Sequence, residues 1–62
     1  MKKETEVSTK KGKLVKFTHT KGIDIGDFYY VLYNSEGNVV RKFSNRETPE
    51  INKAIQFYIN NN

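Results

Sequence analysis

The sequence predicts a small α+β domain in which an antiparallel sheet of three or four strands carries one C-terminal helix on one face. Two observations predict the sheet: residues 28–33 are all aromatic or β-prone, and a turn separates them from a second apolar segment at 39–43. A third observation predicts the helix, because apolar residues recur at helical spacing after residue 50. With 62 residues, the chain is expected to form one domain, 1–62.

The N-terminal third is expected to form the weaker part of the sheet. Residues 1–6 are charged and are expected to be disordered. Residues 7–20 fit a hairpin that turns at Gly12, with its second strand at 14–20. Alternation along that strand predicts two pairs of side chains on opposite faces. The pairs are Val15 with Phe17, and Lys16 with Thr18.

The central hairpin is the strongest feature of the sequence. Residues 34–37 read Asn-Ser-Glu-Gly, which is typical of a four-residue turn with Gly37 at positive φ. A turn of this length fixes which residues of 28–33 and 39–43 face one another. The predicted pairs are Leu32 with Val39, Val31 with Val40, Tyr30 with Arg41, Tyr29 with Lys42 and Phe28 with Phe43.

The last element is predicted to be an amphipathic helix. At its start Thr48 can cap free N–H groups, Pro49 suits the first helical position, and Glu50 complements the helix dipole. The apolar residues that follow have the spacing of one helical stripe. They are Ile51, Ala54, Ile55, Tyr58 and Ile59. This stripe predicts that the helix packs on one face of the sheet.

The predicted register gives the sheet two different faces. The face toward the helix is expected to hold Phe28, Tyr30, Leu32, Val39 and Phe43, with Arg41 at its rim and with Val15 and Phe17 joining it. The second face is expected to hold Tyr29, Val31, Tyr33, Val40 and Lys42, together with Lys16 and Thr18. Aromatic rings interleaved with cations, and no acid, favour nucleic acid, because rings stack on bases and lysines neutralise phosphates. Two alternatives remain: residues 1–13 cover this face, or a second subunit does.

The charge distribution also indicates an anionic partner. Residues 1–21 hold seven lysines and two acids, a balance of +5, whereas residues 22–62 have a balance of −1. A basic third on a near-neutral body favours nucleic acid over an acidic protein or a membrane surface, although lysines also serve solubility. Of the nucleic acids, we expect DNA rather than RNA. The candidate nucleic-acid-binding residues are Lys10, Lys11, Lys13, Lys16, Thr18, Tyr29, Tyr33, Arg41 and Lys42.

Catalysis and cofactor chemistry are not expected. The chain has no cysteine, and His19 is its only histidine. His19, Asp24 and Asp27 make a weak metal-ligand set, and the carboxylates more simply cap turns in a glycine-containing loop. No apolar stretch approaches the roughly 20 residues that span a bilayer. We therefore expect a cytoplasmic protein with no enzymatic activity, cofactor, metal or membrane partner.

The landmarks of residues 26–58 resemble two families of DNA-binding proteins. They are Gly26, the aromatic strand that ends at Tyr33 and Asn34, Gly37, Arg41, Ser44, Pro49 and the amphipathic helix. Their order resembles the small crenarchaeal seven-kilodalton chromatin proteins, SH3-like barrels that bind the DNA minor groove through a sheet. That resemblance implies a binding face of Phe28, Tyr30, Leu32, Arg41 and Phe43. The pattern also resembles the arm-binding domains of tyrosine-recombinase integrases, which read DNA with an open sheet.

The sequence thus predicts a small nucleic-acid-binding protein, with the role of a mobile-element accessory factor as one form of that function. The alternative is a protein–protein module, such as a small inhibitor or regulator of a larger enzyme, that uses residues 28–33 or a sheet edge. The chain is expected to be a monomer or a homodimer. Steep weakening of binding by salt would distinguish nucleic acid from an aromatic protein interface.

Overall fold

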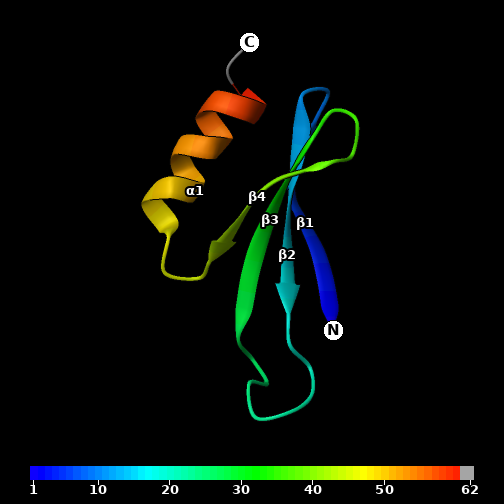
Figure 1. Cartoon of the computed structure of the whole chain (residues 1–62), viewed down its shortest axis with the longest axis vertical. Coiled ribbons are helices and arrows are strands. Elements are labelled where there is room, and N and C mark those ends of the chain that lie inside the picture. The colour runs from blue at the N-terminus through cyan, green and yellow to red at the C-terminus, as the bar shows by residue number, and fades with distance from the viewer. Residues whose placement is uncertain (61–62) are drawn as a thin grey trace.

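The computed structural model has four antiparallel strands followed by one C-terminal helix (Figure 1). The elements are β1 (Lys2–Thr9), β2 (Gly12–Thr18), β3 (Phe28–Asn34), β4 (Val39–Ser44) and α1 (Thr48–Ala54), which continues as a π-helical segment, η1 (Ile55–Asn60). The structure describes the backbone of residues 1–60 and the side chains of residues 1–58. Strands follow one another across the sheet in chain order, so β1 and β4 are its edges. The predicted α+β fold is confirmed, and the sheet is open rather than closed into a barrel.

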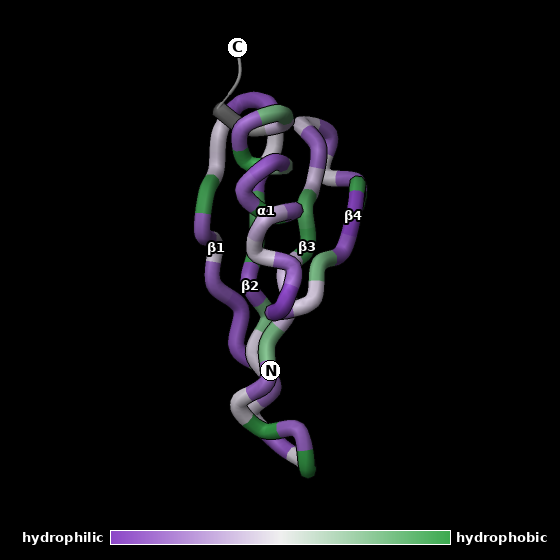
Figure 2. Tube along the Cα trace, turned by 90° about the vertical axis from the view of Figure 1, so that its left-hand side faces the viewer, coloured by the Kyte–Doolittle hydropathy of each residue, from purple (hydrophilic) through white to green (hydrophobic). Residues whose placement is uncertain are grey.

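The helix covers one face of the sheet through a small apolar core. Figure 2 shows α1 lying across β2 and β3, with β1 and β4 to either side. The buried members of this core are Leu14, Leu32, Phe43, Ile51 and Ala54, flanked by Val7, Tyr30 and Ile55. Each large side chain buried in this way contributes about 1.5–3 kcal/mol to folding. The predicted packing of the helix on one face of the sheet is therefore confirmed.

The N-terminal segment forms a full edge strand, so the expected disorder of residues 1–6 is wrong from Lys2 onward. β1 pairs with β2 from Lys2 opposite Thr18 to Thr9 opposite Gly12, with a bulge at Glu6. The segment has little apolar content because an edge strand needs only backbone pairing on one side. Backbone hydrogen bonds to β2 therefore order this segment, although its side-chain pattern does not predict a strand.

The two faces of β2 are the reverse of the prediction. Leu14 lies opposite Leu32 and belongs to the core under the helix. Alternation then puts Val15 and Phe17 on the face away from the helix. Lys16 and Thr18 consequently lie on the helix side. The error arose because a long loop, 19–27, joins β2 to β3, and no tight turn fixes their register.

The register of β3 and β4 is also shifted from the prediction. The pairs are Tyr33 with Val39, Leu32 with Arg41, Val31 with Lys42, Tyr30 with Phe43 and Tyr29 with Ser44. The side-chain Oδ1 of Asn34 accepts hydrogen bonds from the N–H groups of Glu36 and Asn38, at 2.9 and 3.0 Å, which extends the turn by one residue. A bulge then leaves Val40 without a partner on β3. As a result Val39 leaves the helix side, and Val40 joins Arg41 there.

The helix differs from the prediction at both of its ends. Glu47, not Thr48, occupies the N-cap position and makes no side-chain capping bond, while Pro49 lies in the first turn as predicted. The π-helical winding after Ala54 changes the angular spacing of residues, so Tyr58 turns toward β4 and is 42 % exposed. The side chain of Ile59, the last predicted member of the stripe, lies outside the described residues.

Candidate nucleic-acid interface

The sheet face opposite the helix, here called the open face, is organised in three rows of cross-strand neighbours. The first row is Lys3, Phe17, Tyr29 and Ser44; the second is Thr5, Val15, Val31 and Lys42; the third is Ser8, Lys13, Tyr33 and Val39. No secondary-structure element of the described residues lies over these rows. The face therefore presents its side chains to solvent or to a partner.

Aromatic rings occupy one end of the open face in a fixed arrangement. The rings of Phe17 and Tyr29 stack with centroids 5.4 Å apart and planes 15° apart. The His19 ring lies 5.9 Å from that of Tyr29. The Tyr29 hydroxyl donates to the sulfur of Met1 at 3.6 Å. All three rings are half-buried, so they form a platform whose conformation is already set by packing.

Lysines are distributed over all three rows of the open face. Lys13 holds its Nζ 5.3 Å from the centroid of the Tyr33 ring, while Lys3 and Lys42 are exposed. None of the strand residues described on this face is acidic. Glu4 lies opposite Lys16 on the helix side, and the bulge residue Glu6 also faces that side. The open face therefore carries a single sign of charge.

Two valines lie beneath these larger side chains. Val15 is 0 % exposed and Val31 is 3 % exposed, although neither belongs to the core cluster under the helix. Because no described helix lies over this face, we infer that neighbouring rings and lysine stems cover the two valines; long amphipathic side chains can lie along apolar surface and keep their charges in water. This packing restrains the rings that a ligand would contact.

Four of the predicted site residues are brought together on the open face: Lys13, Tyr29, Tyr33 and Lys42. Lys10 and Lys11 lie in the exposed turn between β1 and β2, at the Lys13 end of this face. The sequence analysis missed Lys3 and Phe17. The alternation of Lys13, Val15 and Phe17 could have located Phe17, had Leu14 been taken as the core residue.

Three predicted site residues lie on the other side of the sheet. Lys16 holds its Nζ 4.3 Å from the centroid of the Phe28 ring, and Thr18 lies opposite Phe28. Arg41 contacts Glu47 at 3.3 Å and the Phe43 ring at 4.9 Å. The reversed face of β2 accounts for Lys16 and Thr18. The face implied by the chromatin-protein resemblance includes Leu32 and Phe43, which are buried beneath the helix.

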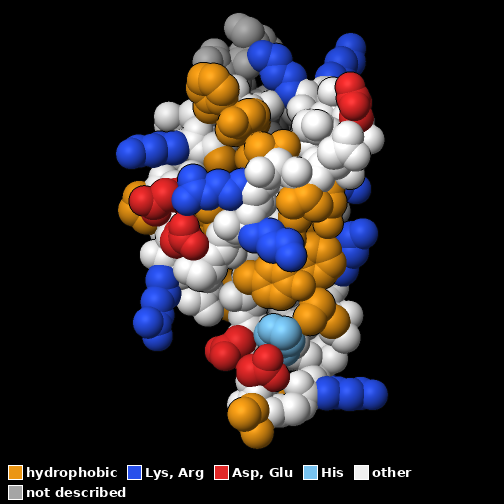
Figure 3. All heavy atoms as spheres, in the orientation of Figure 1, with side chains coloured by type: hydrophobic (Ala, Val, Ile, Leu, Met, Phe, Trp, Pro, Cys, Tyr) orange, Lys and Arg blue, Asp and Glu red, His pale blue; other side chains and the backbone are white. Residues whose placement is uncertain are grey.

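The loop 19–27 closes one end of the open face. His19 Nδ1 lies 3.4 Å from an Asp24 carboxylate oxygen, and backbone bonds join His19 to Gly26 and Asp27. Figure 3 shows the histidine against hydrophobic side chains, with acidic side chains beside it and lysines or arginines nearby. Within the described residues, no group of three histidine, cysteine or acidic side chains could hold a metal ion.

No helix among the described residues has the length and apolar character needed to cross a membrane. No family model, curated protein or solved structure matches this chain. A function for this protein is therefore inferred from the residues of the open face alone.

Proposed function

We propose that this protein binds nucleic acid, preferentially a single strand, on the open face of its sheet. One observation carries the proposal: the four strands together place aromatic rings and three lysines on one face, with no acid among the strand residues there. Service to a mobile element, as an accessory DNA-binding factor, is one setting in which such a protein would act.

The chemistry of the face fits a flexible polyanion. Lys3, Lys13 and Lys42 can each approach a phosphate, which gives affinity without sequence choice. Tyr29 and Tyr33 can stack on bases, and each stacked ring contributes about 1–3 kcal/mol to single-strand binding. Because neighbouring side chains already restrain these rings, binding costs little additional side-chain entropy.

An NMR titration with an oligothymidylate of about ten nucleotides tests the proposal. We expect amide shifts concentrated in the three rows of the open face and little change in the helix. Log K should fall with log salt with a slope of about −2, the value for three phosphate contacts on a single strand. Absence of shifts at about 100 µM oligonucleotide in low salt, or shifts confined to Lys16 and Tyr30, would reject the open face as the site.

A matched pair of charge reversals sharpens the test. Lys13→Glu lies on the open face, and Lys53→Glu makes the same charge change at an exposed position of the helix, on the other side of the sheet. We expect Lys13→Glu to weaken oligothymidylate binding about fivefold or more and to reduce the salt slope by about 0.7. Lys53→Glu should change neither. Equal effects of the two variants would mean that only net charge matters.

A further inference from the structure

The two tyrosines of the open face are each covered on one side only. Phe17, on the neighbouring strand β2, stacks on the Tyr29 ring with planes 15° apart. Lys13, also on β2, holds its Nζ 5.3 Å from the centroid of the Tyr33 ring. Within the described residues, the only other ring contact of either tyrosine is that of His19, just after β2, with Tyr29. The face of each ring that is turned toward β4 is therefore available to a ligand.

The β4 residues beside these rings are short. Ser44 lies opposite Tyr29, and Val39 lies opposite Tyr33. Both are exposed, and Val39 keeps 54 % of its surface. Neither side chain reaches as far from the sheet as a tyrosine ring, so neither covers the ring face beside it. A strip of surface above Val39, Lys42 and Ser44, here called the β4 strip, thus runs along the outer faces of both rings.

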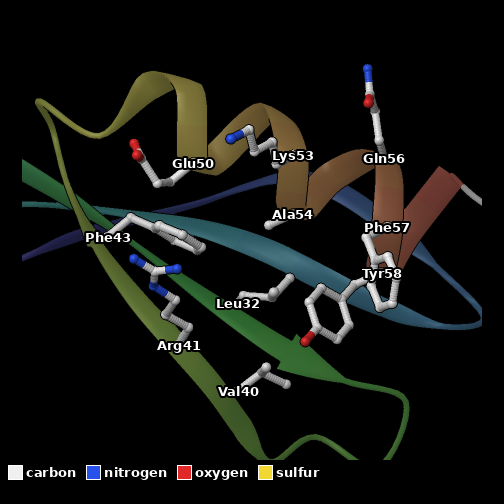
Figure 4. Close-up of a pocket in the computed structure, with 10 residues that line it drawn as sticks. All are labelled: Leu32, Val40, Arg41, Phe43, Glu50, Lys53, Ala54, Gln56, Phe57 and Tyr58. Carbon is white, nitrogen blue, oxygen red and sulfur yellow. The ribbon is translucent and has the colours of Figure 1, made fainter.

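The β4 strip carries one charge, which is positive. Lys42 is exposed, lies midway along the strip and makes no ion pair within the described part of the chain. Arg41, the other basic residue of β4, lies on the helix side (Figure 4) and pairs with Glu47. The turns before and after β4 add the exposed Glu36 and Arg46, whose charges are opposite. A phosphate group is therefore the complement of the middle of the strip.

A nucleic-acid strand that occupies the β4 strip has to be unstacked. Phe17 and Tyr29 stack although they belong to different strands, so ring faces here point across the strands of the sheet. A base that stacks on the outer face of Tyr29 therefore also stacks crosswise. Tyr33 is four residues further along β3, about 13 Å away in the strand direction. The nucleic-acid backbone has to follow β4 between the rings, whereas bases stacked on one another lie about 3.4 Å apart along their own backbone.

This geometry favours pyrimidines. Stacking on a tyrosine is open to every base, because every base has a ring face. The bases must first separate from one another, however, and adenine tracts, whose larger rings stack more strongly, lose more free energy in this step than thymine tracts. In single-strand binding, a modest preference for pyrimidine runs arises from this difference in stacking and backbone flexibility.

We propose that the open face selects unstacked, pyrimidine-rich single strands, whose bases lie in the β4 strip against Tyr29 and Tyr33 and whose phosphate meets Lys42. The inference rests on the proposed function and adds to it the side of the rings that the bases occupy and the class of strand that is favoured. Lys13, on the other side of Tyr33, can still contact a flanking phosphate.

A comparison of two oligonucleotides of equal length tests the preference. At the same salt concentration, an oligothymidylate of about ten nucleotides should bind about threefold or more tightly than the oligodeoxyadenylate. Equal affinities, or tighter binding of the oligodeoxyadenylate, would overturn this inference and leave nucleic-acid binding intact. No binding of either oligonucleotide would reject the proposed function and this inference with it.

Two pairs of residues on opposite edge strands test the position of the bases. Intermolecular NOEs should join thymine methyl protons to the methyl groups of Val39, on β4; NOEs to Thr5, on β1, in their place would overturn the inference. Lys42→Gln should weaken oligothymidylate binding about three- to tenfold in low salt, because it removes the phosphate contact between the rings. Lys3→Gln removes the same charge from an exposed position three strands away and should have a smaller effect. Equal effects, or a larger effect of Lys3→Gln, would place the bound strand outside the β4 strip.

Discussion

The two sides of the sheet are equally buried at their centres but are covered in different ways. Leu32 is 0 % exposed beneath the helix, and Val15 is 0 % exposed on the face that no element covers. The first packs with Ile51 and Ala54, whereas for the second the described chain offers as cover only side chains of the sheet itself. A sheet in a chain this small can therefore bury apolar residues on both sides with only one helix.

This difference gives the aromatic residues of the open face two roles. Phe17 and Tyr29 are proposed to contact the ligand and, at the same time, are neighbours of Val15 and Val31 on the same face of β2 and β3. A truncation at the open face is thus expected to reduce stability as well as binding. Experiments on that face therefore need binding and stability to be measured on the same variants.

The largest expected effect is on the helix side. Leu32→Ala should cost about 2–5 kcal/mol, comparable to the total stability of a domain this small, because it leaves a cavity between the helix and the sheet. Chemical denaturation should show a largely unfolded variant at room temperature. A near-normal midpoint would mean that the helix contributes little to the core.

A smaller but definite loss of folding stability is expected for truncation of a buried valine on the open face. Val31→Ala should cost about 1–3 kcal/mol, because the valine is buried although no helix covers it. Val39→Ala, on the same face but mostly exposed, is the control and should stay within about 0.5 kcal/mol of wild type. Equal behaviour of the two variants would show that the rings do not bury the second row.

The Tyr29 variants test whether one ring serves both roles of the open face. Tyr29→Ala should lose oligothymidylate binding by about 1–3 kcal/mol and also lower the unfolding midpoint. Tyr29→Phe should keep most of the binding affinity and most of the stability, because the stacking surface with Phe17 remains. Binding is measured by titration and stability by urea unfolding of the same samples. A Tyr29→Ala variant with unchanged affinity would remove this ring from the proposed site.

The two sides of the sheet also explain which parts of the structure could be predicted from the sequence. The order of elements followed from periodicity and turn residues, and the helix stripe identified Ile51 and Ala54 as core. The face of β2 could not be chosen, because Leu14 and Val15 are both buried and alternation alone does not distinguish them. The bulge at Val40 depended on one extra residue in the turn. Of the candidate site, the residues on β3 were therefore placed correctly and Lys16 and Thr18 on β2 were not.

The smallest expected effect concerns the joint between β4 and the helix. The Ser44 N–H donates to Glu47 Oε1 at 2.9 Å, and Arg41 lies 3.3 Å from the other carboxylate oxygen. The backbone hydrogen bond from Ser44, assisted by the Arg41 charge, lowers the pKa of Glu47 below its ordinary value of 4.5. A depressed pKa in the folded state means that the ionised carboxylate stabilises folding above the unfolded pKa. That stabilisation is lost as pH falls through the folded value.

Glu47→Gln should therefore be less stable than wild type near neutral pH, by less than the loss at Val31, and the difference should shrink at about pH 3. Urea unfolding at about pH 7 and about pH 3 measures this, with Glu36→Gln in the exposed turn as the control for removal of a carboxylate that makes no ion pair in the described chain. Because Glu47 joins β4 to the helix, the variant should also shift amides at the end of β4 and the start of the helix and leave those of the open face in place. A loss of stability that is the same at both pH values would mean that the charge of Glu47 does not stabilise the contact between β4 and the helix.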